Sequence, residues 1–597
     1  MKFVIRPIFL ILVVALVVRL WGIAYGLPLF LVNDERAGVY GALKMIELKT
    51  LVPVWHDAEF RTVLNYLPLP SYLYLIALVP VLGIGYLVSG APDPEAYRAA
   101  LTLDPTPIFI AARALMALLG TLSVYLTYRL GRSVFQSERA GLLAAMFLAV
   151  SFYHVQVSHV TRHWMPALVA INVALLASVA VYRSGRLRSY LWAGLTAGLG
   201  VGSNTAAAGA MIPVAAAHFL RPGEMRWHRR LTDRRLLAAV GAFLGISLLF
   251  IAIYPYGLTQ GEIPGGGLGD TLAKKYAMLA RLFDGATLGE FVGYFVWLAF
   301  TYETALAAMA LIGTVLALRT HSWWLAMSAL YALGYFLALY LFFGVIVRGI
   351  LFVLPIAAVF AGYAVDRLLH WFQPRIRPTF TAALSLFAIS TLLFFAWPLV
   401  LALRYDQLLA RPDTRLAALE WMYANTPAGA KILADTPYLR LTNTKAGIKE
   451  LERIDPAGLR IQDRALLAVS DQRYPQRSRE VLNLHFVSRD SPYRNAGAER
   501  LFSRRGYRYL VLESSYEDLR DVDPLLSAIA AKSRQLVRIH GFRRDGFGRA
   551  LDLSGEIDTV RPWRLWELTR FGLIVDVYAL DEREPGAQTA PPASEVL

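Results

Sequence analysis

An acidic pair, Asp34 and Glu35, is the first polar cluster that the chain presents after its first long apolar segment. Carboxylates at a membrane surface need a chemical or electrostatic reason, because lipid offers nothing to neutralise them. Such a group can take a proton from an acceptor hydroxyl or amine, or hold a divalent cation against a phosphate. The alternative is structural, since Asp favours helix N-termini and would cap the helix that follows. Both roles can coexist.

Further groups that can bind an anion follow in the same stretch and in a later loop. His56 and the run Tyr66–Pro70 belong to the first stretch, whereas Arg162 stands between His159 and His163. An arginine can clamp a phosphate, or it can be an interfacial anchor. The two histidines are four residues apart and would share a helix face, which is compatible with zinc. This loop has no Cys or carboxylate to complete the ligand set, so interfacial histidines are the alternative.

Arg348 is a further candidate for phosphate binding, because it stands at the start of a long apolar segment. An arginine at that depth can hold a lipid phosphate through two parallel hydrogen bonds. It can also extend its side chain to ordinary phospholipid headgroups. The stretch Tyr254–Tyr256 and the pair Lys274-Lys275 are compatible with a headgroup site without being diagnostic.

The elements that must position these groups are membrane helices. Of 597 residues, 56% are hydrophobic and 17% charged, and the mean hydropathy is +0.45, which is typical of a polytopic membrane protein. The absence of cysteine excludes disulfides and thiolate chemistry. The net charge of +16 does not indicate nucleic acid, because Arg404 onward carries 30 basic and 27 acidic residues. The remaining 30 basic and 17 acidic residues cluster in short loops, as the positive-inside rule expects.

About eleven membrane spans are predicted from the apolar segments. The N-terminus resembles a signal peptide but has no small-residue cleavage site, so we expect a retained first span with a cytoplasmic N-terminus. The short segments 189–203 and 205–220 are rich in Gly and Ala, which indicates a close-packed helical hairpin. The spans are expected near residues 7–30, 107–129, 139–156, 165–183, 189–203, 205–220, 236–256, 303–319, 322–343, 348–369 and 378–403.

Residues 68–89 are apolar enough to cross the membrane, and the charges of the neighbouring loops decide against a crossing. If they crossed, the basic loop with Arg129, Arg132 and Arg139 would face outward, against the positive-inside rule. We therefore predict that residues 31–106 form one long external loop with juxtamembrane helices. This assignment places the C-terminus outside.

From Arg404 onward the composition becomes that of a soluble domain. A helical run at Asp413–Ala424 is followed by strand-like runs at Lys431–Ala434, Tyr509–Glu513, Gln535–His540 and Leu573–Tyr578. The sequence thus predicts a transmembrane domain at 1–403 and an extracytoplasmic, mixed α/β domain at 404–597.

The ordered set of these motifs resembles the membrane-embedded glycosyltransferases of the GT-C superfamily. Within it, the chain is most similar to bacterial relatives of dolichyl-phosphate-mannose protein mannosyltransferases and aminoarabinose transferases, over roughly residues 20–370. The matching stretches are Asn33–Glu35, Tyr66–Tyr72, Ala112–Gly120 with Tyr128–Arg132 and Arg139–Leu143, His154 with Ser158-His159, and Arg348–Pro355.

The resemblance implies a GT-C fold and an inverting transfer of sugar from a polyprenyl-phosphate donor to a glycan, lipid or protein acceptor. Asp34 would be the catalytic base or a metal-facing carboxylate, supported by Glu35, and Arg348 would bind the donor phosphate. We expect Arg162, His159, His56 and Tyr66 to complete the donor site. Neither a nucleotide nor another cofactor is required, although a divalent cation at Asp34 is possible. The enzyme would lie in a bacterial cytoplasmic membrane and act at its outer face.

Two departures from the family pattern leave alternatives open. The family's second loop usually has an acidic residue shortly before a proline, where this chain reads Arg162–Pro166, and a lysine in the following hairpin is replaced by Asn204. These gaps imply a different donor, a role transferred to Glu303 or Asp270, or reduced activity. A transporter or flippase of lipid-linked glycans would favour charges deep within spans and related halves of the chain. An inactive scaffold is the third hypothesis.

Overall fold

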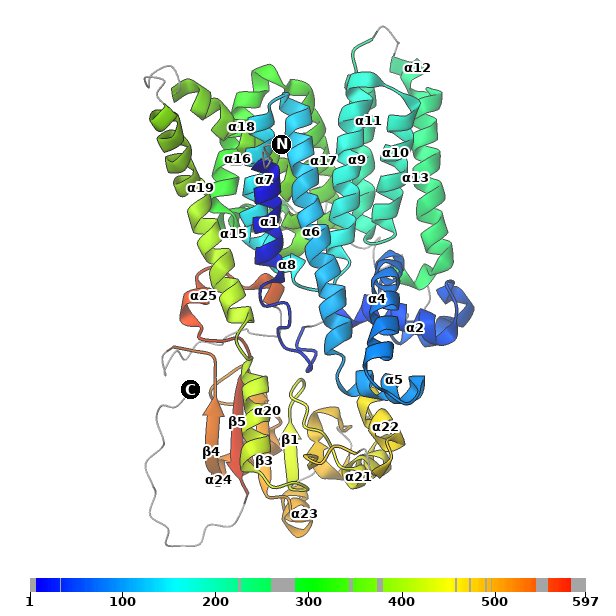
Figure 1. Cartoon of the computed structure of the whole chain (residues 1–597), viewed down its shortest axis with the longest axis vertical. Coiled ribbons are helices and arrows are strands. Elements are labelled where there is room, and N and C mark those ends of the chain that lie inside the picture. The colour runs from blue at the N-terminus through cyan, green and yellow to red at the C-terminus, as the bar shows by residue number, and fades with distance from the viewer. Residues whose placement is uncertain are drawn as a thin grey trace. The chain divides into compact units, whose positions relative to one another are not determined.

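The computed structural model describes residues 7–32, 34–223, 227–258, 285–342, 347–372, 380–456, 459–471, 474–488, 491–494, 497–543 and 557–580. The chain divides into two compact units, which are described separately (Figure 1). The first unit comprises Met1–Tyr97, Pro105–Arg411 and Glu556–Leu568, and the second comprises Arg98–Asp104, Pro412–Gly555 and Thr569–Leu597. The predicted boundary between residues 403 and 404 falls inside α19, which runs on to Leu409.

The first unit is helical throughout its described residues. Its α-helices are α1 (Pro7–Leu20), α2 (Glu35–Leu48), α3 (Asp57–Arg61), α4 (Leu69–Val88), α6 (Thr106–Phe135), α7 (Glu138–Val150), α8 (Phe152–Ser158), α9 (Trp164–Ser184), α10 (Leu187–Val201), α11 (Met211–Leu220), α12 (Trp227–Leu231), α13 (Arg234–Ile253), α15 (Gly285–Tyr302), α16 (Thr304–Thr320), α17 (Ser322–Phe342), α18 (Leu354–Phe372), α19 (Phe380–Leu409) and α25 (Arg564–Glu567). Helix α5 (Pro94–Leu103) begins in the first unit and belongs to the second from Arg98 onward. Short 3₁₀ helices are η1 (Pro53–His56), η2 (Thr205–Ala210), η3 (Pro255–Leu258), η5 (Val347–Val353) and η11 (Ile557–Thr559).

The chain is a polytopic helical membrane protein. Six helical segments of the described chain are long and apolar enough to span a membrane, and two bent pairs, α7 with α8 and α15 with α16, raise the number to eight. The helices α1 and η2–α11 are apolar but shorter, whereas residues 69–88 pass the test of length and composition. In Figure 1, α4 lies beside α2 and the lower part of α6, below the lower ends of α9 to α13.

Small residues allow these helices to pack closely. A side chain at Gly194 on α10 would collide with the carbonyl of Ala239 on α13, and one at Gly313 on α16 would meet the carbonyl of Phe360 on α18. Gly362 on α18 faces the backbone of α7, with 2.6 Å from a built Cβ to the Ala140 carbonyl oxygen. Without a hydrophobic effect between helices in lipid, such close backbone contacts hold the bundle together.

The second unit contains a five-stranded mixed sheet of order β2-β1-β3-β5-β4. The strands are β1 (Lys431–Asp435), β2 (Glu480–Asn483), β3 (Tyr509–Ser514), β4 (Arg534–Ile539) and β5 (Ile574–Ala579). Strand β1 pairs in parallel with β2 on one side and β3 on the other, and β5 pairs antiparallel with β3 and β4. Its helices are α20 (Thr414–Asn425), α21 (Lys445–Ile454), α22 (Ile461–Ala468), α23 (Ala498–Arg504) and α24 (Pro524–Lys532). The predicted mixed α/β character is therefore confirmed, with β2 as the strand that the prediction omitted.

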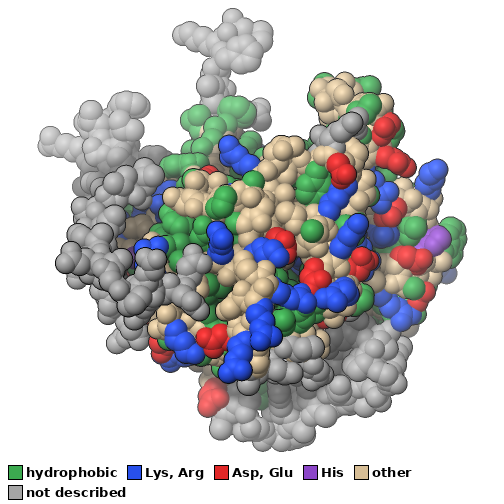
Figure 2. All heavy atoms as spheres, turned by 90° about the horizontal axis from the view of Figure 1, so that it is seen from below, with side chains coloured by type: hydrophobic (Ala, Val, Ile, Leu, Met, Phe, Trp, Pro, Cys, Tyr) green, Lys and Arg blue, Asp and Glu red, His purple; other side chains and the backbone are tan. Residues whose placement is uncertain are grey.

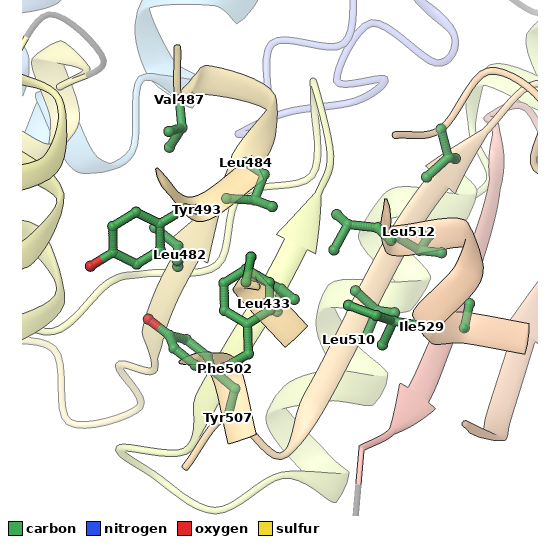
Figure 3. Close-up of a cluster of buried hydrophobic side chains, with 14 of the residues drawn as sticks. Leu433, Leu482, Leu484, Val487, Tyr493, Phe502, Tyr507, Leu510, Leu512 and Ile529 are labelled. Atoms are coloured by element: carbon green, nitrogen blue, oxygen red, sulfur yellow. The ribbon is translucent and has the colours of Figure 1, made fainter. Parts of the chain in front are cut away.

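Successive residues of a strand point to opposite sides of a sheet, and in this sheet each side has its own buried cluster. Leu433, Leu510 and Leu512 pack with Phe502 and Ile529 in one cluster (Figure 3). Their strand neighbours Ile432, Ala434 and Val511 enter a second cluster, which includes residues of α20. On the face drawn in Figure 2, basic and acidic side chains are intermixed, in line with the balanced charge of this part of the sequence.

Candidate functional site

A cavity of about 220 Å³ lies at one end of the helix bundle of the first unit. It forms where α9 begins, where α10, α13 and α17 end, and where the short helices η2, η3 and η5 connect them. Fourteen residues line it: Asp34, Tyr66, Leu67, Arg162, His163, Trp164, Ser203, Asn204, Thr205, Ala206, Gly257, Leu258, Leu339 and Arg348. Segments that are far apart in the sequence thus meet around one space.

Two arginines and one carboxylate give the cavity its charge. Arg162 is buried, in the loop between α8 and α9, whereas Arg348 is half-buried on η5. Asp34 is exposed just before α2 and has a left-handed backbone conformation with φ of 63°. It makes no side-chain hydrogen bond to the start of α2, so the structure does not support the alternative role as a helix cap. The left-handed region is uncommon for non-glycine residues, although Asp adopts it more readily than most.

Tyr66 connects this carboxylate to an aromatic wall. Its hydroxyl hydrogen-bonds to Asp34, and burial together with the Asp34 charge raises the pKa of Tyr66 to about 12, although Arg162 and Arg348 act in the opposite direction. The phenol therefore stays protonated and donates a hydrogen bond to Asp34. The ring of Tyr66 packs on His163 with 4.0 Å between centroids, and His163 packs on Trp164 at 5.0 Å. Burial, with the charges of both arginines, lowers the pKa of His163 to about 3, so this imidazole is neutral near pH 7.

Glu35 does not line the cavity, although it follows Asp34 directly. It is buried with Arg113 of α6, whose Nε and Nη2 donate to its two oxygens at 2.9 and 2.6 Å. The Thr161 amide also donates to Glu35 at 3.1 Å, and the Thr161 hydroxyl donates to the Glu35 carbonyl at 2.9 Å. Arg113 additionally binds the carbonyls of Ile23 and Tyr25 at 2.7 Å each. Glu35 therefore fixes the loop that carries Arg162 against the start of α2.

Three further contacts shape the lining. Ser203 donates to the carbonyl of His163 at 2.7 Å, and the Asn204 side chain accepts from the amide of Ala206 at 2.9 Å, which caps η2. Gly257 lies so close to the chain at Tyr66 and Leu67 that a Cβ there would stand 2.6 Å from the Leu67 nitrogen. Asn204, at the place where the family usually has a lysine, is thus a backbone cap at the cavity wall.

The structure separates His159 and His56 from the cavity lining. His159 is buried, with its ring nitrogens 2.9 and 3.1 Å from the carbonyls of Val155 and Trp21, and its Nε2 lies 3.5 Å from Asp406. His56 is half-buried at the end of η1. The expectation that His159 and His163 share a helix face is wrong, because α8 ends at Ser158 and α9 begins at Trp164.

A metal site does not fit the described residues. No group of three His, Asp or Glu side chains among them is arranged to hold an ion, and Asp34 is the sole carboxylate among the described lining residues. Glu303, a candidate to replace the missing acidic residue of the second loop, is buried and accepts from the Ser151 hydroxyl and the Tyr153 amide at 2.6 and 2.8 Å. Asp270 and Lys274-Lys275 lie outside the described residues.

Sequence reasoning missed two groups that organise the site. Arg113 was noted only as part of a family motif. A lone arginine in an apolar helix needs a partner, however, and so indicates a buried carboxylate nearby. Gly257 follows the stretch Tyr254–Tyr256. The local sequence gives no indication that it is needed there, because the residues that lie against it, Tyr66 and Leu67, come from a distant loop.

Comparisons with known proteins agree with the resemblance seen in the sequence. Residues 99–255 match the family model described as dolichyl-phosphate-mannose-protein mannosyltransferase, which confirms the resemblance over that stretch. Among the curated proteins nothing matches.

Several solved structures are similar at low identity. The chain is 13% identical to ArnT from Cupriavidus metallidurans in the apo state, with a TM-score of 0.45 over 95% of this chain and 97% of that one. The same protein bound to undecaprenyl phosphate gives 12% identity and a TM-score of 0.43, over 97% and 99%. AglB from Archaeoglobus fulgidus, in complex with an inhibitory peptide and a dolichol-phosphate, gives 15% and 0.38, over 76% of this chain and 62% of that one. The chain thus spans less than two thirds of AglB, and these likenesses assign no residue role.

Proposed function

We propose that this protein is an inverting glycosyltransferase that moves a sugar from a polyprenyl-phosphate donor to an acceptor at the outer face of the cytoplasmic membrane. The observation that carries the proposal is the convergence of Asp34, Arg162 and Arg348 on one cavity at one end of the bundle. The family match over residues 99–255 supports the same chemistry.

The two guanidiniums suit a phosphate that leaves. In the reaction, the acceptor oxygen forms a bond to the anomeric carbon of the sugar while the bond from that carbon to the phosphate oxygen breaks. Negative charge then grows on the lipid phosphate, and Arg162 and Arg348 stabilise it through charge-assisted hydrogen bonds. The electron pair of the broken bond stays with the phosphate, so no nucleotide is consumed.

Asp34 suits the role of the base. It takes the proton of the acceptor hydroxyl as the new bond forms, and attack from the side of the sugar opposite the leaving phosphate inverts the anomeric configuration. Tyr66 holds the carboxylate in place through its hydroxyl. The neutral His163 leaves the two arginines as the cationic side chains among the described lining residues. Because the described residues offer no set of metal ligands, we derive no step through a metal.

Two variants test the proposal in membranes that contain the acceptor of the producing cell. The assay follows transfer of radiolabelled sugar from a synthetic polyprenyl-phosphate donor, and thermal shift measures the binding of polyprenyl phosphate to the purified protein. We expect Asp34→Asn to bind polyprenyl phosphate normally but to lose about 100-fold or more in transfer, as for the loss of a general base.

Arg348→Ala should instead weaken phosphate binding by about tenfold or more, the scale of one hydrogen bond to a charged group. Arg129→Ala is the matched control, because Arg129 is exposed and lies in the second half of α6, away from its cavity-side start. Unchanged transfer by Asp34→Asn would overturn the proposal. So would movement of the lipid-linked sugar across vesicles without any glycosidic product, which is the behaviour of a flippase.

A further inference from the structure

The segment of residues 557–568, called the return segment here, belongs to the first unit although it comes late in the chain. Its backbone is tied to three helices. The carbonyls of Thr559 and Val560 accept from Tyr302 of α15 at 2.6 Å and from Gln156 of α8 at 2.8 Å. The carbonyls of Leu565 and Leu568 accept from the guanidinium of Arg404 on α19 at 3.2 and 2.6 Å.

The return segment has a buried side and an exposed side. Pro562, Leu565 and Leu568 are buried, at intervals of three residues. Between them, Trp563 and Trp566 are 45% and 40% exposed. A tryptophan on the surface of a soluble protein would hide more of its ring, because indole is one of the largest apolar groups.

Two more tryptophans extend the exposed side. Trp397 of α19 is 55% exposed and stacks on Trp566 with 6.2 Å between centroids, and Trp297 of α15 is 40% exposed and lies 6.5 Å from Trp563. We call these four residues the indole cluster. Figure 1 shows α25 beside the lower part of α19 and below α15. None of the four lines the cavity described above.

A cation lies within this cluster. Arg561 is exposed, and its guanidinium carbon stands 5.3 Å from the ring centre of Trp297 and 5.7 Å from that of Trp563. No acidic side chain of the described residues forms an ion pair with it. Its neighbour Arg564 differs, because it already pairs with Glu567 at 3.4 Å.

Only one environment suits both parts of this surface. Water disfavours four exposed indoles, and hydrocarbon disfavours a guanidinium. The layer of lipid headgroups accepts an indole at its apolar edge and supplies phosphates for the cation. A phosphate is also the anion that a planar guanidinium binds best, through two parallel hydrogen bonds.

We propose that the return segment is a phospholipid-binding element. The indole cluster lies among the headgroups, and Arg561 binds the phosphate of an anionic phospholipid. The lipid therefore holds at the bilayer surface the point where the chain returns to the first unit, independently of the cavity and of sugar transfer.

A depth measurement tests the first half of the proposal, and the absence of cysteine makes labelling simple. The variants Trp566→Cys and, as control, Trp421→Cys on α20 of the second unit receive a nitroxide label in the full chain in lipid nanodiscs. We expect the label at 566 to collide more with oxygen than with a water-soluble nickel complex, and the label at 421 to show the reverse. Equal exposure to the nickel complex at both positions would overturn the proposal. So would protection from both agents at 566, which would indicate a covering protein.

A lipid-retention measurement tests the second half. The purified protein is exchanged into detergent with equal amounts of phosphatidylglycerol and phosphatidylcholine, and native mass spectrometry counts the lipids retained. We expect Arg561→Gln to lose the preference for phosphatidylglycerol at least threefold, whereas Arg561→Lys keeps part of it. Arg564→Gln is the matched control, since Arg564 is already neutralised by Glu567. An unchanged preference in Arg561→Gln would overturn the assignment, as would displacement of the lipid by millimolar inorganic phosphate.

Discussion

Two arginine–carboxylate arrangements lie side by side at one end of the bundle, and they differ in what is left for a ligand. In the buried arrangement, one arginine and one carboxylate face each other, and Arg113 and Thr161 together bind both oxygens of Glu35. In the cavity, two arginines line the same space as one carboxylate, and Asp34 is exposed. The first arrangement is complete within the protein, whereas the described lining of the second has two basic side chains and one acidic side chain, a balance that suits a phosphate.

The difference arises between two consecutive residues. Asp34 has a left-handed backbone, and the next residue starts α2, so their side chains leave the chain in different directions. The two sites are also coupled, because Thr161 binds Glu35 and its neighbour Arg162 lines the cavity. A buried ion pair outside the cavity thus sets the position of an arginine that lines it.

The largest effect should follow from breaking the buried pair. Arg113→Ala leaves the Glu35 carboxylate without its partner in a buried site, and we expect a loss of about 3–5 kcal/mol in stability. The thermal midpoint in detergent measures it. Arg348→Ala is the matched control on the cavity side and should change the midpoint little. Similar midpoints for the two variants would contradict the division into a structural and a ligand-binding arginine.

A smaller effect is expected where η3 lies against the loop that carries Tyr66. Gly257→Ala places a methyl group 2.6 Å from the Leu67 nitrogen and 2.8 Å from the Tyr66 carbonyl carbon, so the loop must move. We expect a loss of about 1–3 kcal/mol, the usual cost of overpacking, and a drop in sugar transfer as Tyr66 shifts from Asp34. Gly245→Ala on α13 is the control, because no atom lies within 4 Å of its built Cβ. If both variants keep wild-type transfer, the position of Tyr66 is unimportant.

The sequence was sufficient to bring Asp34 and Arg348 to one place. Long apolar segments and basic loops fix which helix ends meet, and both residues stand at such ends. It could not separate Asp34 from Glu35, because that difference depends on one backbone angle and on Arg113 from another helix. It failed for His159 and His163 because a five-residue connection, residues 159–163, separates α8 from α9, and both histidines lie in that connection.

The boundary of the second unit shows a related limit. Arg404 and Asp406 resemble the start of a soluble domain, yet both are buried in the last turns of α19. Arg404 is satisfied there by carbonyls of the return segment, more than 150 residues further along the chain. A contact between residues so far apart in the sequence leaves no periodic pattern that could predict it. Strand β2 was missed for a simpler reason, since its four residues are too few for a strand pattern.

The cavity should also respond to acid through His163. His163 has a pKa of about 3 in the folded protein, against about 6.5 when unfolded. The unfolded chain therefore binds the proton first, and stability falls as pH drops from 6.5 towards 3. At pH 5.5 we expect a loss of roughly 1–2 kcal/mol relative to pH 7.5. His163→Gln should abolish this share of the loss in thermal midpoint, and an unchanged pH dependence would refute the neutral imidazole.

The smallest effect tests the hydrogen bond that holds the cavity carboxylate. Tyr66→Phe removes the hydroxyl that donates to Asp34 but keeps the ring on His163. One hydrogen bond to a charged group is worth about 1.5 kcal/mol at the low end that suits an exposed carboxylate, so we expect transfer to fall about tenfold. Binding of polyprenyl phosphate should stay normal, because both arginines remain.

Thr161→Val is the counterpart on the buried side, since it removes the hydrogen bond to the Glu35 carbonyl. It should weaken phosphate binding through Arg162 rather than the transfer step. If the two variants instead lose binding and transfer in the same proportion, the carboxylate and the arginines do not act as separate parts of the site.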